Sequence, residues 1–152
     1  MLYSEKLRPF AAAHPCRTID VDGAQVRYIL TGKPEGRTRV FLNGGMNTLE
    51  MWMDYVDALA DTGRVLLFDY PQQLRTNQAL VAGMHAFFAA LKGKILLILP
   101  DQDFFSGQMQ QDLIRLMHEP EIRYVSGGHL SIVLKTEDYI RTIRAFLAGQ
   151  PD

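Results

Sequence analysis

The chain has 152 residues, of which 47% are hydrophobic, 22% charged and 10% aromatic, so it is long enough for one globular domain with its own core. This composition excludes a disordered, collagen-like or coiled-coil protein. The 16 Lys and Arg residues nearly balance the 17 Asp and Glu residues, and the net charge of -1 gives no basic field that would attract nucleic acid. We therefore expect one soluble domain over residues 1–152.

Cysteine and hydropathy exclude further classes. The single cysteine, Cys16, cannot form an intramolecular disulfide or a zinc site built from several cysteines. No two histidines have metal-ligand spacing, so we predict neither metal nor cofactor. The longest apolar run, residues 95–100, is far shorter than the roughly 20 residues that span a bilayer. The opening sequence MLYSEKLRPF lacks the apolar stretch of a signal peptide. We expect a cytoplasmic protein that makes no membrane contact.

The N-terminal part of the chain predicts a helical arm followed by a hairpin. Residues 1–16 form the expected arm. Two short extended runs, residues 17–21 and 25–30, flank the pair Asp22-Gly23. An Asp-Gly pair between two such runs is typical of a tight β-turn that joins antiparallel strands.

From residue 40 onwards, short apolar strands alternate with amphipathic helices. The strands are predicted over residues 40–42, 64–68, 94–99 and 122–125, and the expected helix N-caps are Asn47, Thr76, Ser106 and Thr136. Strands that are apolar on both faces are typical of parallel sheets covered by helices. We therefore predict a three-layer α/β fold with a mostly parallel sheet, helices on both faces and an N-terminal β-hairpin.

Polar and glycine residues follow several of these strands, where functional groups of open α/β sheets collect. Gly44 and Gly45 could present backbone N–H groups to an oxyanion, or simply form a tight turn. Asp103 and His129 follow the last two strands; a carboxylate on one imidazole nitrogen leaves the other nitrogen free as a base. Asp101 competes with Asp103 for this position, and Asp103 could instead cap the following helix.

In these segments the chain resembles the α/β-hydrolase superfamily, of the single-domain esterase and lyase type. The matching segments occur in the family's order within residues 17–148: FLNGGMNTLEMW, VLLFDYPQ, KILLILPDQD and VSGGH. The resemblance implies that Asp103 is the triad acid and His129 the triad base. It also implies an oxyanion and substrate-binding segment formed by Asn43, Gly44, Gly45 and Met46, although the family usually has histidine where this chain has Asn43.

The family's nucleophile elbow, G-x-S-x-G, is missing from this chain. None of the four serines, Ser4, Ser106, Ser126 and Ser131, lies in such a motif. An aspartate nucleophile after residues 94–99 would need small flanking residues, where the chain has Pro100 and Gln102. The nucleophile is therefore unknown, and we expect a truncated α/β-hydrolase fold without its central segment and cap.

These features predict a pseudoenzyme, a catalytically impaired relative of hydrolases that act on small esters or amides. One alternative is a non-catalytic module that binds a small molecule or a protein. A less favoured alternative is a Rossmann-like nucleotide-binding domain, with Gly44 and Gly45 followed by Asp69, but the full G-x-G-x-x-G is absent. A shortened sheet should leave apolar helix residues such as Phe87 and Phe88 unpacked, which predicts a homodimer. It should also make residues 40–42 and 94–99 parallel neighbours.

Overall fold

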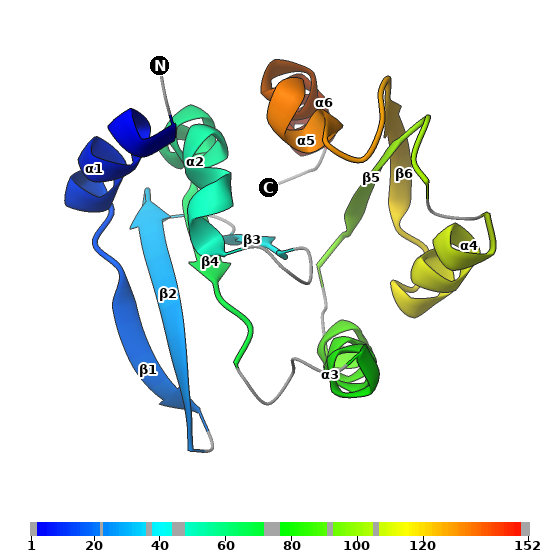
Figure 1. The fold of residues 1–152 in the computed structure, drawn as a ribbon, viewed down its shortest axis with the longest axis horizontal. Helices are drawn as coiled ribbons and strands as arrows, with labels where there is room; N and C mark the ends of the chain where they lie inside the picture. Colours follow the sequence, from blue (N-terminus) through cyan, green and yellow to red (C-terminus); the bar gives the residue numbers. More distant parts are fainter. Residues whose placement is uncertain are drawn as a thin grey trace. The chain divides into compact units, whose positions relative to one another are not determined.

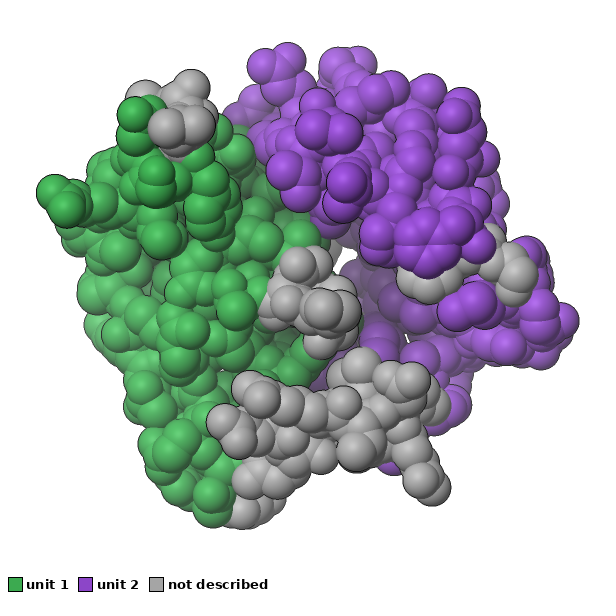
Figure 2. Space-filling view, viewed as in Figure 1, with its two compact units in different colours: residues 1–77 green, residues 78–152 purple. Residues whose placement is uncertain are grey.

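The computed structural model describes residues 3–21, 23–35, 38–43, 48–71, 77–90, 93–104 and 107–149. The chain divides into two compact units, residues 1–77 and 78–152 (Figure 2). The single domain over residues 1–152 stays a prediction.

The first unit contains a four-stranded mixed sheet in the order β1-β2-β4-β3 (Figure 1). Its elements in chain order are α1 (Tyr3–Ala13), β1 (Arg17–Val21), β2 (Ala24–Gly32), β3 (Thr38–Phe41), η1 (Leu49–Trp52), α2 (Met53–Leu59), η2 (Ala60–Thr62) and β4 (Arg64–Phe68). β1 pairs with β2 and β2 with β4 in antiparallel fashion, whereas β3 and β4 are parallel. The predicted hairpin is confirmed, and Asp22 in its turn lies outside the described residues.

The core of the first unit follows from the alternation of buried and half-buried residues along β4. Val65 and Leu67 are fully buried, and their partners in β2 are Thr31 and Ile29. Further large, fully buried side chains come from η1 and α2: Leu49, Val56 and Leu59. Their burial places the apolar side chains of these helical segments in the same core as one face of the sheet.

The second unit contains a pair of parallel strands and four helices. Its elements are α3 (Asn77–Ala90), β5 (Leu96–Pro100), α4 (Gly107–Leu116), β6 (Glu121–Val125), α5 (Ser131–Leu134) and α6 (Thr136–Ala148). The register runs from Leu96 opposite Glu121 to Pro100 opposite Val125, so both strands end side by side. α6 packs against β5 and β6.

The predicted α/β class is confirmed, and the sheet is mixed rather than wholly parallel. Two of the four observed strand pairings are antiparallel, because the hairpin strand β2 pairs directly with β4. Parallel pairing joins β3 to β4 and β5 to β6. Pairing between residues 40–42 and 94–99 would join the two units, and it stays a prediction.

Two local predictions need correction. Thr136 does not cap α6: it is the first helical residue, and its hydroxyl donates to the carbonyl of Val133 at 3.0 Å, because α5 directly precedes it. Phe88 is not left unpacked, since only 4% of it is exposed. Phe88 therefore no longer supports the predicted homodimer, which stays a prediction. Three other predicted caps, Asn47, Thr76 and Ser106, lie outside the described residues.

Candidate functional site

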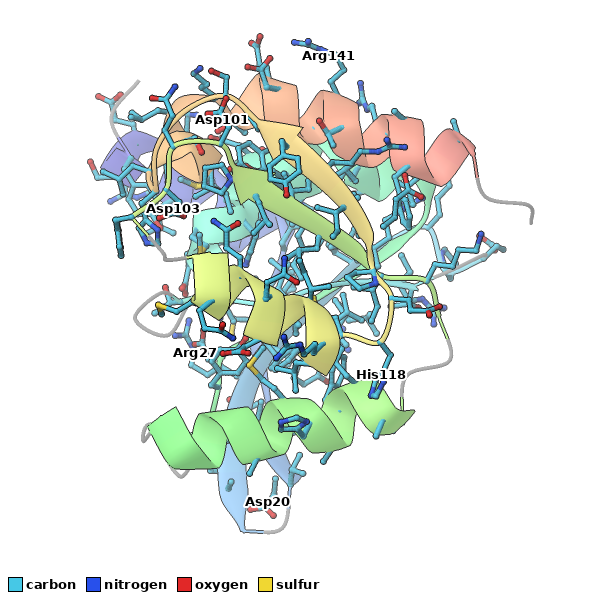
Figure 3. The ribbon with its side chains drawn as sticks, turned by 90° about the vertical axis from the view of Figure 1, so that its right-hand side faces the viewer. Asp20, Arg27, Asp101, Asp103, His118 and Arg141 are labelled. Atoms are coloured by element: carbon cyan, nitrogen blue, oxygen red, sulfur yellow. The ribbon has the colours of Figure 1, made fainter. Side chains whose placement is uncertain are left out.

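The loops that follow β5 and β6 are held together by backbone hydrogen bonds. The Asp101 N–H donates to the carbonyl of Val125, and the Gln102 N–H donates to that of Gly127, both at 3.0 Å. These bonds continue the parallel ladder one step beyond each strand. The turn with Asp101 and Asp103 (Figure 3) is thereby fixed against the loop that carries His129.

Asp101 stabilises this loop directly. Its Oδ1 accepts a hydrogen bond from the Gly127 N–H at 2.8 Å. Gly127 has φ +132°, which a residue with a side chain rarely adopts, and a Cβ there would lie 3.1 Å from the Cβ of Ser131. The carboxylate of Asp101 therefore satisfies a backbone donor in a loop whose shape depends on glycine.

Asp103 lies beside His129. The His129 Nδ1 is 3.2 Å from Oδ1 and 3.3 Å from Oδ2 of Asp103. The carboxylate side chain is only 5% exposed, whereas the imidazole is 46% exposed. The Phe104 ring also contacts His129, at a centroid distance of 4.5 Å. A buried acceptor at Nδ1 favours the tautomer in which Nδ1 carries the proton, and Nε2 then has a lone pair that can accept one.

The described serines have different surroundings. The hydroxyl of Ser131 is 2.8 Å from that of Tyr139 and is buried with it. Ser126 is exposed after β6, Ser4 is exposed in the first unit, and Ser106 lies outside the described residues. Because Ser131 is buried and its hydroxyl is paired, its observed surroundings do not suit a nucleophile that must reach a substrate.

Asn43 lies in the first unit, where its side chain is hydrogen-bonded within the protein. Its Oδ1 accepts from the Trp52 Nε1–H at 2.7 Å, and its Nδ2 donates to the Phe68 carbonyl at 2.8 Å. The Tyr70 hydroxyl donates to the Asn43 carbonyl at 2.8 Å. Asn43 is only 6% exposed, so it joins the ends of β3 and β4 to η1. Gly44, Gly45 and Met46 lie outside the described residues, and the oxyanion role of this segment stays a prediction.

Asp69 belongs to an ionic network that the sequence did not indicate. Its Oδ2 accepts from Arg27 at 2.9 Å, and its Oδ1 accepts from the Leu49 N–H at 2.7 Å. Arg27 also pairs with Glu50. Burial raises the pKa of Glu50, but hydrogen bonds from Thr48, Arg27 and its own backbone, together with the positive charge of Arg27, outweigh burial and leave this pKa lowered. Both carboxylate oxygens of Asp69 are engaged, which argues against its use as the ribose-binding acid of a nucleotide site.

His14 has partners that sequence spacing could not reveal. Its Nδ1 is 2.8 Å from the Thr31 hydroxyl, and its Nε2 is 3.5 Å from the Asp57 carboxylate. These contacts link the segment after α1 to β2 and α2. Within the described ranges, no group of three or more His, Cys, Asp or Glu side chains is arranged to hold a metal ion. No helix in the same ranges is long and apolar enough to cross a membrane.

Comparison with known proteins defines the fold class. No protein-family model matches the chain, and no curated protein matches it. Among solved structures, the chain is similar to a predicted CIB-like hydrolase from Thermoplasma acidophilum, with a TM-score of 0.71 and 15% identity over 91% of this chain and 99% of the other. It is also similar to carboxylesterase CesB (YbfK) from Bacillus subtilis, with a TM-score of 0.65 and 10% identity over 98% of each chain.

The chain therefore has the fold of the α/β hydrolases, as the sequence motifs implied. The alignments extend over nearly all of both solved chains, so the missing central segment and cap stay a prediction.

Proposed function

We propose that this protein is a catalytically impaired α/β hydrolase related to enzymes that cleave small esters or amides. The observation that carries the proposal is the Asp103–His129 pair, in which a buried carboxylate lies 3.2 Å from Nδ1 of a half-exposed imidazole. The name of the similar protein from Bacillus subtilis, a carboxylesterase, supports an ester as the substrate class.

The pair supplies a general base for ester hydrolysis and the carboxylate that orients it. Asp103 holds the imidazole so that Nε2 accepts a proton from an attacking hydroxyl or water, and its negative charge stabilises the imidazolium that forms. The imidazolium then gives this proton to the leaving alkoxide or amine as its bond to the carbonyl carbon breaks. General base catalysis of this kind contributes about 10²- to 10⁴-fold in rate. The sequence offers no G-x-S-x-G nucleophile, so water is the expected attacking group and hydrolysis should be slow.

Two measurements test this proposal. Incubation with a fluorophosphonate probe, followed by intact mass spectrometry, should give no stoichiometric adduct. Hydrolysis of an activated ester such as p-nitrophenyl acetate should be slow and should fall to the solution rate in His129→Ala. The matched control is His85→Ala, which removes an exposed histidine from α3 in the same unit.

A stoichiometric adduct on Ser106, Ser126 or Ser131 would show that the chain has a working nucleophile, and the impairment would then be refuted. If His129→Ala and the native protein hydrolyse the ester at equal rates, the Asp103–His129 pair has no role in hydrolysis.

A further inference from the structure

The segment that carries His129 continues directly into α5, and there it is tied to α6. Ser131, the first residue of α5, has its hydroxyl 2.8 Å from the hydroxyl of Tyr139 in α6. Ser131 is 3% exposed and Tyr139 is 4% exposed. Because a buried hydroxyl without a partner is unfavourable, each of these groups holds the other in place.

Ser131 is also coupled to the backbone on the other side of His129. Its N–H donates to the Gly128 carbonyl at 2.9 Å. Its Cβ is so close to Gly127 that a Cβ at that glycine would lie only 3.1 Å away. A displacement of Ser131 would therefore displace the loop of residues 127–129.

The pKa of the Tyr139 phenol depends on the same surroundings. Burial raises the pKa of its phenol, the hydrogen bond with Ser131 lowers it, and the negative charge of Asp103 raises it further. α6 in turn packs against β5 and β6, the strands that precede Asp103 and His129.

We propose that Tyr139 is a positioning residue for the Asp103–His129 pair, and that its hydroxyl, acting through Ser131, keeps Nδ1 of His129 directed at Asp103. This inference rests on the proposed function for its purpose, since the pair matters as the base of hydrolysis and the carboxylate that orients it. Tyr139 itself contributes no group to the reaction.

The test is the tautomer of His129, recorded by long-range proton–nitrogen NMR of the imidazole without substrate. In the native protein the tautomer with the proton on Nδ1 should predominate. Tyr139→Phe and Ser131→Ala each remove one hydroxyl and so break the hydrogen bond between the two residues. Each variant should change the ratio of the two tautomers by about fivefold. The double variant should show no larger change than either single variant, because all three lack the same bond.

Tyr124→Phe is the matched control, since it removes the hydroxyl of an exposed tyrosine on β6, and it should leave the His129 signals unchanged. Lowered thermal stability in Tyr139→Phe and Ser131→Ala with an unaltered His129 spectrum would overturn the inference and leave a structural role only. Ser131→Ala keeps a good helix former in α5 and tests the idea even if Tyr139→Phe does not fold. Since no substrate is present, absence of hydrolysis does not affect this result.

Discussion

The carboxylates of Asp101 and Asp103 are separated by one residue and have different environments. Asp101 is exposed and accepts a backbone hydrogen bond from Gly127. Asp103 is 5% exposed and faces the imidazole of His129. Charge interactions are weakly screened away from water, so the buried carboxylate affects an adjacent imidazolium more strongly than an exposed one would. The turn thus presents one acid to the backbone and the other to the imidazole.

Tyr70 gives a pH-dependent prediction at the scale of one residue. Burial raises the pKa of Tyr70 to about 12, and its hydroxyl donates to the Asn43 carbonyl. A folded-state pKa above the unfolded value of about 10 gives a contribution to stability that is complete below pH 10 and is lost as pH rises through 12. At neutral pH, Tyr70→Phe should lower the free energy of unfolding by about 1 kcal/mol.

The same comparison at about pH 11 should give a smaller difference, because the native protein has begun to lose this contribution and the variant has none to lose. Urea unfolding at both pH values measures the two differences. A difference that stays constant would show that ionisation of Tyr70 is not linked to folding.

At the scale of elements, the end of β2 lies against η2 so closely that only glycine fits. Gly32 has φ +84°, and a Cβ there would lie 2.2 Å from the Gly63 carbonyl oxygen and 2.9 Å from that of Ala60. Gly23, in the hairpin turn, has φ +82° but nothing within 4 Å of such a Cβ. The two glycines have nearly the same positive φ and differ in the space around them.

Gly23→Ala should therefore cost about 1 kcal/mol of unfolding free energy, from the positive φ alone. Gly32→Ala should cost more than about 3 kcal/mol, because the backbone of η2 must also move. Urea unfolding of both variants measures the comparison. Equal costs would show that β2 and η2 separate easily.

Local sequence patterns were sufficient to predict most helices and strands. They were not sufficient to predict which strands pair when the strands are far apart in the chain. The Asp-Gly turn and the apolar run of β4 depend on neighbouring residues, so the sequence predicted them. The antiparallel pairing of β2 with β4 depends on residues far apart in the chain. α5 was missed because it is only four residues long and leaves Val133 and Leu134 exposed, which gives no amphipathic pattern.

The candidate site shows the same division. Asp103 and His129 could be proposed because both follow parallel strands, whose ends share one edge of a sheet. The choice between Asp101 and Asp103 depended on turn geometry, which spacing does not give. Tyr139 was missed because helical spacing alone does not show that it is the buried residue of α6, while the neighbouring Ile140 and Ile143 are only half-buried.

At the scale of the whole molecule, unfolding of the two units can be followed by two different signals. Trp52 belongs to the first unit, so its fluorescence reports on that unit, whereas the imidazole signals of His129 report on the second. If residues 1–152 behave as one domain, both signals should change at the same urea concentration. Two separate midpoints would instead show that the units unfold independently.

The strand order of the first unit has a consequence for biosynthesis. β1, β2, β3 and β4 all come from residues 17–68 and pair only with one another in the described sheet. Growing chains fold unit by unit from the N-terminus while the ribosome is still adding residues. The four-stranded sheet can therefore complete its hydrogen bonds during translation, before the strands that precede Asp103 and His129 have left the ribosome.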